Sequence, residues 1–189
     1  MACGFRAATG DIIVMLDADG SADPAEIPAF VSALIAGADF AKGSRFVFDP
    51  RAGSDDITAL RRAGNAGLNL VANVLFRSRF TDLCYGYNAF WRRVVPVLDL
   101  PLPSVERTEN MQWGDGFEIE TLINCRIAAA GLTITEVPST ELRRIHGETN
   151  LRTFADGTRV LRTLVAEWIR ARRRGAAPDV AVGALTARG

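Results

Sequence analysis

The apolar positions of the chain form short runs separated by polar, glycine and proline residues. Residues 11–16 are a continuous β-favouring run that stops at acidic residues, the pattern of a central parallel strand covered on both faces. Asp23 and Pro24 suit the first positions of a helix, which Gly37 would end. Residues 40–46 follow as a second strand. Together these elements predict a right-handed βαβ unit, in which ligands collect at the carboxyl ends of the strands.

The remainder of the chain continues this alternation. Its spacing predicts helices over 58–77, over 117–130 with Asp115 as cap, and from Asp156 to Arg174; extended segments over 81–92 and 132–137; and polar loops at 48–57, 101–103 and 143–150. The apolar face of the 58–77 helix is expected to hold Leu60, Leu68, Val71, Leu75 and Phe76. The fold class is therefore α/β. We expect one domain over residues 1–174 and a disordered tail over 175–189.

Composition narrows the class of protein. Basic and acidic residues number 22 each, so no net field favours nucleic acid as a partner. The chain has three widely spaced cysteines, no CxxC pair and one histidine, which predicts reduced thiols and no zinc site. No apolar run approaches the ~20 residues of a membrane span, and the start does not resemble a signal peptide. These features predict a cytoplasmic protein.

The strongest chemical motif follows the first predicted strand. Asp17 and Asp19 are separated by one residue, and alternate side chains of extended backbone share one face, so both carboxylates can reach one cation. Hard oxygen ligands of this kind suit Mg²⁺ or Mn²⁺, with water and diphosphate oxygens completing the sphere. Such a metal would neutralise charge that builds on a departing nucleoside diphosphate.

Two other interpretations of this motif are open. It can be a solvated turn in which Gly20 supplies the bend. It also matches a haloacid-dehalogenase-like phosphatase, with Asp17 as nucleophile and Asp19 as acid/base. The phosphatase pattern needs a downstream lysine and a second acidic pair after a strand. Lys42 is the only lysine, and residues 114–116 follow Met-Gln-Trp instead of a strand.

Several separated segments together resemble family 2 glycosyltransferases, within them the branch of dolichol-phosphate mannose synthase and polyprenyl-phosphate glycosyltransferases. They are residues 8–19, 43–46, 81–88, 116–120 with 136–138, and 144–150. The resemblance implies a GT-A, Rossmann-like sheet with flanking helices. It also implies an inverting transfer from a nucleotide-sugar donor to a polyprenyl or dolichyl phosphate or another acceptor such as a glycan.

The resemblance also implies roles for individual residues. Asp17 and Asp19 would hold the metal and Asp17 the nucleotide, with Ser21 adding an outer contact. The residues expected to bind donor or acceptor phosphate are Arg45, Arg61, Arg62 and Arg144. Forked guanidinium groups suit phosphate, although each arginine can instead be a solvated or ion-paired surface residue.

The need for a catalytic base depends on the acceptor. A lipid phosphate, with a second pKa of about 6, attacks without a proton acceptor, whereas a hydroxyl group needs one. Glu120 matches the family position of the general base, and its alternative role is a charge that favours a helix N-terminus. Asp82 and Asp115 are further candidate bases that can instead be turn or cap residues.

The chain departs from the family pattern in three places. Asn88 stands where the family has arginine, and Thr149-Asn150 stand where it usually has Ser-Lys. Only about ten residues precede the strand of residues 11–16, so the nucleoside-binding segment is expected to be missing and the domain to be N-terminally incomplete. The second hypothesis is therefore a truncated, non-catalytic α/β binding module.

Two kinds of partner remain open besides donor and acceptor. The arginines of residues 170–174 can contact anionic lipid at the cytoplasmic membrane face, which would make the protein peripheral. They can equally be explained by the dipole at a helix C-terminus. Self-association into a homo-oligomer is also left open.

Overall fold

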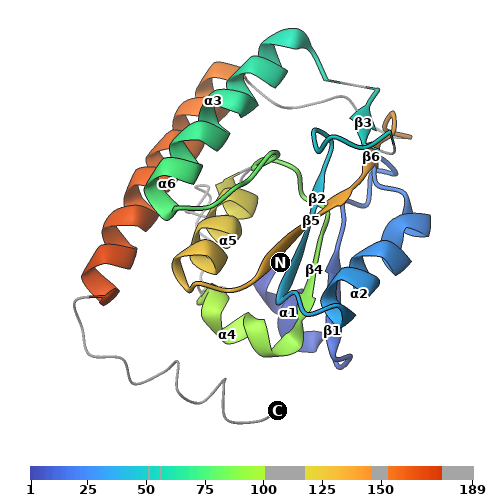
Figure 1. Ribbon diagram of the computed structural model, residues 1–189, viewed down its shortest axis with the longest axis horizontal. Coiled ribbons are helices and arrows are strands. Elements are labelled where there is room, and N and C mark those ends of the chain that lie inside the picture. Colours follow the sequence, from blue (N-terminus) through green and yellow to red (C-terminus); the bar gives the residue numbers. More distant parts are fainter. Residues whose placement is uncertain (51, 56, 101–117, 146–152, 176–189) are drawn as a thin grey trace.

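The computed structural model describes residues 1–50, 52–55, 57–100, 118–145 and 153–175 (Figure 1). Its helices are α1 (Ala2–Ala7), α2 (Ile27–Ile35), α3 (Ala59–Phe76), α4 (Val95–Leu98), α5 (Glu118–Ala129) and α6 (Thr153–Gly175), with 3₁₀ turns η1 (Pro24–Glu26) and η2 (Arg92–Val94). Its strands are β1 (Ile12–Met15), β2 (Phe40–Ser44), β3 (Gly53–Ser54), β4 (Asn88–Trp91), β5 (Ile134–Pro138) and β6 (Thr140–Glu141). The positions expected for Asp115, for Thr149-Asn150 and for a tail after Gly175 lie outside the described residues.

The main sheet is mixed, with strand order β1-β4-β2-β5. Strand β4 is antiparallel to both β1 and β2, whereas β2 and β5 are parallel. The prediction that residues 11–16 form a central parallel strand is therefore wrong, because β1 ends the sheet within the described residues and pairs antiparallel with β4. The sequence of β1 could not reveal this pairing, because β4 lies more than 70 residues further along the chain. The expected burial on both faces is present, since Ile13 packs on one side and Val14 on the other.

Helices cover both faces of this sheet (Figure 1). Helix α2 covers one face, where Phe30 and Leu34 pack against the alternate side chains Ala41 and Ala89. On the other face α1, α4 and α5 pack over Phe40, Phe90 and their neighbours. Helices α3 and α6 lie beyond α5 and contribute to a third core cluster. The expected α/β class with helices on both faces is confirmed.

The cap predicted at Asp23 is present, and Thr58, the predicted start of the next helix, caps α3. The Asp23 side chain accepts a hydrogen bond from Ala25 N at 2.9 Å, and the Thr58 hydroxyl accepts one from Arg61 N at 3.3 Å. Gly37 and Gly131 follow α2 and α5 with φ of 114° and 68°, values that glycine adopts without strain.

The apolar face of α3 is confirmed except at Leu60. Leu68, Val71, Leu75 and Phe76 pack against the third core cluster, whereas Leu60 is 57% exposed. The buried centre of α3 consists of Asn65, Asn69 and Ala72. At about 100° per residue, Leu60 lies roughly 120° from Ala72 around the helix. The buried centre of α3 is therefore displaced toward the amide residues and away from Leu60.

Gly43 of β2 lies where the backbone of the 85–87 segment comes very close. A Cβ atom at Gly43 would lie 2.8 Å from Tyr87 O and 3.1 Å from the Tyr85 ring. We expect Gly43→Ala to lower the free energy of unfolding by ~1–3 kcal/mol, because backbone must shift to relieve the overlap. Gly67→Ala is the matched control: nothing lies within 4 Å of its Cβ position in α3, so alanine should stabilise by ~0.5–1 kcal/mol. Urea denaturation measures both, and equal effects would contradict the close-packing argument.

Candidate active site

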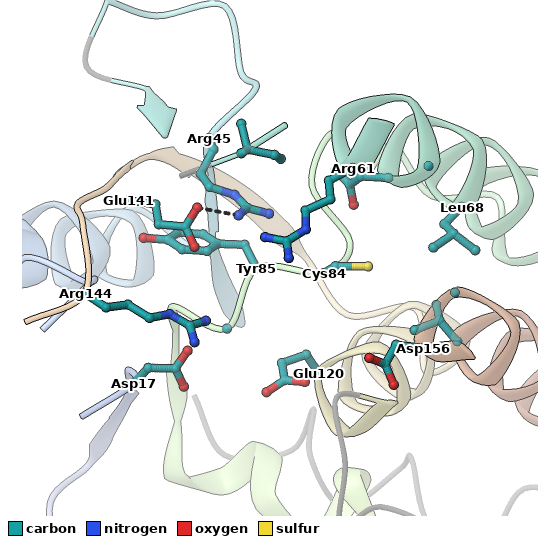
Figure 2. Close-up of a pocket in the computed structure, with 16 residues that line it drawn as sticks. Asp17, Arg45, Arg61, Leu68, Cys84, Tyr85, Glu120, Glu141, Arg144 and Asp156 are labelled. Atoms are coloured by element: carbon teal, nitrogen blue, oxygen red, sulfur yellow. Dashed lines mark hydrogen bonds and ion pairs between the residues drawn. The ribbon is translucent and has the colours of Figure 1, made fainter. Parts of the chain in front are cut away.

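A cavity of about 230 Å³ lies beyond the carboxyl end of β1, facing the first turns of α3, α5 and α6 (Figure 2). Its polar lining consists of Asp17, Arg45, Arg61, Asn65, Cys84, Tyr85, Glu120, Glu141, Arg144 and Asp156. Ile57, Leu68 and Val160 supply apolar walls. Side chains from the whole length of the described chain therefore meet in one concave site, the usual setting for ligand binding.

Asp17 and Glu120 face each other across Gly86. A Cβ atom at Gly86 would lie 3.6 Å from Asp17 Oδ2 and 3.7 Å from Glu120 Cγ, ordinary contact distances. Burial raises the pKa of Asp17, and the nearby charge of Asp19 raises it further, although Arg144 opposes this effect. Glycine at position 86 thus leaves open the space between the two side chains, and a Cβ atom there would touch both without overlap.

Asp19 is held by its neighbours. Its Oδ1 accepts the Ser21 N–H at 2.9 Å, and its Oδ2 pairs with Arg144 Nε at 3.0 Å. Burial opposes ionisation of Asp19, yet the hydrogen bonds from Ser21 and the charge of Arg144 lower its pKa overall. Ser21 itself is buried. Asp19 is therefore a stable anion already partnered with a cation.

Glu120 lies in the first turn of α5 and points into the cavity (Figure 2). Burial raises its pKa to about 7, and the negative charge of Asp17 contributes in the same direction, whereas Lys42 opposes it. A general base works best when its pKa lies near the working pH. The environment of Glu120 is therefore suited to that role.

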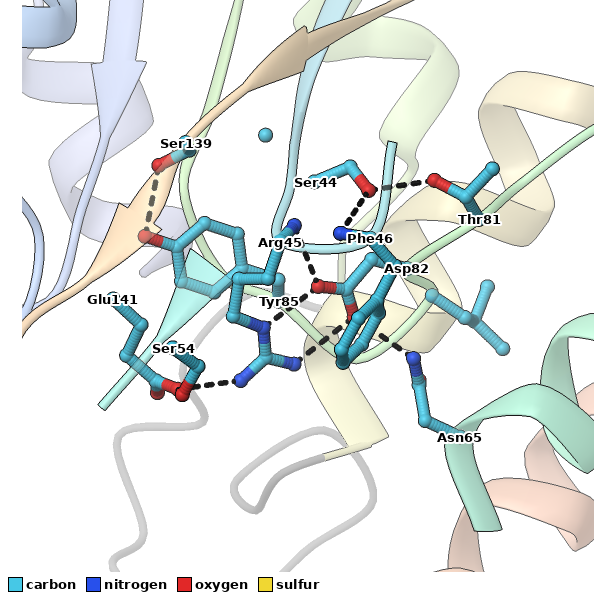
Figure 3. Close-up of polar contacts among 12 residues, drawn as sticks. Ser44, Arg45, Phe46, Ser54, Asn65, Thr81, Asp82, Tyr85, Ser139 and Glu141 are labelled. Carbon is cyan, nitrogen blue, oxygen red and sulfur yellow. Dashed lines mark hydrogen bonds and ion pairs between the residues drawn. The ribbon is translucent and has the colours of Figure 1, made fainter. Parts of the chain in front are cut away.

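Arg45 forms a buried network of ion pairs with Asp82 and Glu141 (Figure 3). Its guanidinium contacts Asp82 through Nε at 2.7 Å and Nη2 at 3.0 Å, and contacts Glu141 through Nη1 at 2.8 Å. Burial opposes the charge of Arg45, but the hydrogen bonds and charge of Asp82 raise its pKa well above the usual value. The group still lines the cavity, so it presents a fixed cation at the wall.

Asp82 has a different environment from the one its proposed catalytic role requires. Its carboxylate is fully buried and accepts hydrogen bonds from Arg45 N, Nε and Nη2 and from Asn65 Nδ2. It does not line the cavity. A carboxylate whose lone pairs are occupied in this way has no access to an acceptor proton. The geometry favours a structural role for Asp82, which is to orient Arg45, over the predicted role as a base.

The remaining arginine candidates line the cavity or the groove beside it. Arg61 and Arg144 line the cavity, and Figure 2 shows their guanidinium groups directed into it. Arg62 instead lines a neighbouring groove of about 660 Å³, where its guanidinium lies over the Phe46 ring. Of the candidates, the structure thus brings Asp17, Glu120, Arg45, Arg61 and Arg144 together in the cavity. Arg62 lines only the neighbouring groove, which Arg45 also lines.

An asparagine ladder on α3 was missed by the sequence analysis. Asn65, Asn69 and Asn73 recur every four residues and bind the segment before β4: Asn65 contacts Asp82, Asn69 contacts Thr81 O and Leu83 N, and Asn73 contacts Phe80 O and N. The spacing of polar amides on one buried helix face was the available indication. Cys84, Tyr85 and the α6 residue Asp156 also line the cavity without having been predicted.

The acidic residues suit a divalent cation only in part. Within the described ranges, no cluster of three or more His, Cys, Asp or Glu side chains is arranged to hold a metal ion. Burial raises the pKa of the Asp17 carboxyl group, and a bound cation would lower it again. Asp19 Oδ2 is engaged by Arg144, so a metal would compete with that guanidinium. The donor set fits an ion that keeps most of its ligands as water and diphosphate oxygen, as Mg²⁺ does.

The fold matches that of solved GT-A glycosyltransferase structures. Glucosyl-3-phosphoglycerate synthase from Mycobacterium tuberculosis, in complex with phosphoglyceric acid, matches 95% of this chain and 55% of its own with a TM-score of 0.58 and 17% identity. The same synthase in complex with uridine diphosphate matches with a TM-score of 0.54 and 19% identity. At these identities the likeness concerns the fold alone.

Sequence comparison then identifies the family. Residues 1–95 match the model of glycosyl transferase family 2, and the chain belongs to that family. It is 34% identical over 146 residues to glycosyltransferase AglJ of Haloferax volcanii, covering 77% of this chain and 43% of that protein. It is 29% identical to the undecaprenyl-phosphate mannosyltransferase of Micrococcus luteus (84% and 62% covered) and 30% identical to the polyprenol monophosphomannose synthase of Mycolicibacterium smegmatis (83% and 54%).

Family membership overturns the phosphatase interpretation of Asp17. The single lysine, Lys42, is fully buried, and its ammonium group donates to main-chain carbonyls. The lysine of a phosphatase site would instead have to reach the substrate. The chain spans about half the length of the curated relatives it matches. None of the helices in the described part of the chain is sufficiently long and apolar to cross a bilayer.

Proposed function

We propose that the protein is an inverting, metal-dependent glycosyltransferase that moves a sugar from a nucleotide-sugar donor to a polyprenyl phosphate. The observation that carries the proposal is the pair of carboxylates, Asp17 and Glu120, facing each other in a cavity lined by Arg61 and Arg144. Three of the compared relatives support the class of activity, and two of them carry a polyprenyl acceptor in their names. The proposed catalytic domain extends over residues 1–174.

The proposed reaction forms one bond and breaks one. An acceptor oxygen attacks the anomeric carbon of the donor sugar from the face opposite the leaving group, and the bond to the diphosphate oxygen breaks with its electron pair. Arg144 and Arg61 would bind the departing diphosphate, while Asp17 and Asp19 would hold Mg²⁺ or Mn²⁺. The metal, when bound, supplies Lewis acidity to that leaving group. Arg45 contributes a fixed positive charge at the wall.

The acceptor decides whether Glu120 acts as a base. A lipid phosphate is already ionised near neutral pH, so its oxygen attacks without help. A hydroxyl acceptor would give its proton to Glu120, whose pKa of about 7 suits that transfer. We favour the phosphate acceptor because of the relatives' names, and the hydroxyl acceptor is the second candidate because of the environment of Glu120.

The proposal is tested first at the donor. Calorimetry with UDP and GDP in the presence of Mn²⁺ is expected to show binding, and UDP is a suitable probe because it binds the compared synthase. Asp17→Asn should weaken this binding ~10-fold or more, about 1.4 kcal/mol, because one carboxylate of the metal pair loses its charge. Incubation with UDP- and GDP-sugars should give Mn²⁺-dependent release of the diphosphate.

Asp23→Asn is the matched control. Asp23 lies four residues past Asp19 and caps η1 through Ala25 N, and asparagine caps a helix as well as aspartate. This variant should bind Mn²⁺ and nucleotide like the wild type. An absence of binding to either nucleotide, with or without metal, would instead favour the non-catalytic binding module.

A further inference from the structure

The segment from Leu83 to Tyr87 forms the wall of the cavity between Asp17 and Glu120, and its carbonyl groups are held individually. Leu83 O accepts from Asn124 Nδ2 at 2.9 Å, Tyr85 O from Lys42 Nζ at 2.6 Å, Gly86 O from Asn88 Nδ2 at 3.1 Å and Tyr87 O from Gly43 N at 2.8 Å. Three of these four donors are buried side chains from β2, β4 and α5. Hydrogen bonds from side chains therefore hold most of this segment in place. In a regular β-strand, main-chain hydrogen bonds would do so.

Lys42 is the unusual member of this set. It is the only lysine of the chain and is fully buried. On the α5 side of the sheet it lies directly opposite Asn88 in β4 and Glu136 in β5. Its Nζ donates to Tyr85 O and, at 3.3 Å, to Gly43 O. Within the described part of the chain, no carboxylate lies within 4 Å of this ammonium group, so main-chain oxygens are its partners.

A buried ammonium group without a paired anion is expensive. Removing one ion from water costs several kcal/mol even after the surrounding protein relaxes. A methionine or glutamine would fill the same volume without that cost. The presence of a lysine at this position therefore calls for a reason other than stability.

The hydrogen-bond partners of Lys42 suggest such a reason. Lys42 holds the carbonyl of Tyr85, and Asn88 holds the carbonyl of Gly86, so together they fix both ends of the residue that separates the two carboxylates. The positive charge also opposes the rise that burial causes in the pKa values of Glu120 and of the Cys84 thiol. One buried side chain thus acts on the position of the wall and on the charge of the group facing it.

We propose that Lys42 is a positioning residue of the cavity: together with Asn88 it fixes the Tyr85–Gly86 peptide that sets the separation of Asp17 and Glu120. The consequence for catalysis rests on the proposed function, whereas the consequence for the wall does not. Lys42→Met keeps the volume of the side chain and removes both the donor and the charge.

The first test measures the wall without any substrate. We expect Lys42→Met to change the unfolding temperature little, because removal of the buried charge offsets the loss of the hydrogen bond to the Tyr85 carbonyl. Amide hydrogen exchange over residues 83–88 should nevertheless become at least ~10-fold faster. Thr163→Val is the control, because Thr163 is another fully buried polar residue, in α6, and should leave exchange over 83–88 unchanged. Unchanged exchange over residues 83–88 in Lys42→Met would overturn the proposal.

The second test uses the single lysine as a spectroscopic probe. Protein labelled with ¹³C at lysine Cε gives one side-chain signal, whose titration reports the charge of Lys42 directly. Burial lowers the pKa of Lys42, and the charges of Asp82 and Glu136 oppose that effect while Arg45 adds to it. Glu120→Gln, which leaves those groups in place, should shift the titration to slightly lower pH, since electrostatic coupling is reciprocal. A Lys42 titration identical in the two proteins would overturn the electrostatic part of the inference.

The third test applies where donor turnover is measurable. Lys42→Met should lower kcat by ~10²-fold with little change in KM for the donor, because a small misplacement of the reacting groups affects the chemical step. A donor KM that rises while kcat stays constant would contradict a positioning role. If no turnover is found for the wild type, the proposed function fails, while the exchange and titration results still decide the role of Lys42.

Discussion

Glu120→Gln is expected to lower kcat for transfer to a hydroxyl acceptor by ~10²–10⁴-fold, the usual contribution of a general base. For a lipid phosphate acceptor the same variant should lose less than ~10-fold, because that nucleophile is ionised near neutral pH. The measurement compares kcat with a short-chain polyprenyl phosphate and with a hydroxyl acceptor, using one donor. The ratio of the two losses identifies the acceptor class that the cavity serves.

The pH dependence provides a second readout of Glu120. Burial raises its pKa from 4.5 to about 7, the charge of Asp17 contributes, and Lys42 opposes both. Only the ionised carboxylate accepts a proton, so kcat for a hydroxyl acceptor should rise as pH increases through about 7. In Glu120→Gln this rise should disappear.

Stability should change with pH in the opposite direction. Because the pKa of Glu120 is higher in the folded chain than in the unfolded chain, its protonation stabilises the fold fully below about 4.5, and this contribution is lost as pH rises through about 7. Glu120→Gln should remove that loss and be more stable than the wild type at pH 8. Glu118→Gln is the control for the measurements of kcat, because Glu118 lies two residues earlier in α5 and outside the cavity lining.

Equal effects of the two substitutions on kcat would contradict a base at Glu120.

The features that could be predicted from sequence are those governed by local chemistry. Caps at Asp23 and Thr58 and the glycine stops after α2 and α5 are local preferences, and all are present. The motif of Asp17 and Asp19 was found because both residues follow an apolar strand directly. The proposed role of Glu120 as a base was inferred from family resemblance. The fold adds burial that raises its pKa to about 7, a value that suits this role.

The features that could not be predicted depend on contacts across the chain. Strand β4 inserts between β1 and β2, and the pairing of Ile13 with Phe90 has no local sign. Arg45 was expected to meet phosphate, but its partners are 37 and 96 residues away. Lys42 was noticed only as a lysine that a phosphatase would need. Its burial beneath the cavity follows from the register of β2 against β4 and β5.

Asp82→Ala is expected to lower the free energy of unfolding by ~3–5 kcal/mol, because it leaves the Arg45 guanidinium buried without its bidentate partner. For a domain of this size the melting temperature should fall by roughly 6–20 °C. The double variant Arg45→Met/Asp82→Leu should recover much of that loss, since apolar side chains of similar volume replace a buried pair with little effect on stability. Thermal and urea denaturation of the three proteins measure these differences.

Asp11→Ala is the control for this experiment, because the Asp11–Arg92 pair is 3.9 Å long and largely exposed and should contribute less than ~1 kcal/mol. Asp82→Asn separates the structural role from the catalytic one. A structural Asp82 predicts that this variant loses stability and that any loss of kcat follows from misplacement of Arg45. Full stability combined with a loss of the pH-dependent rate in Asp82→Asn would instead restore Asp82 as a base, because only the proton-accepting function would then have been removed.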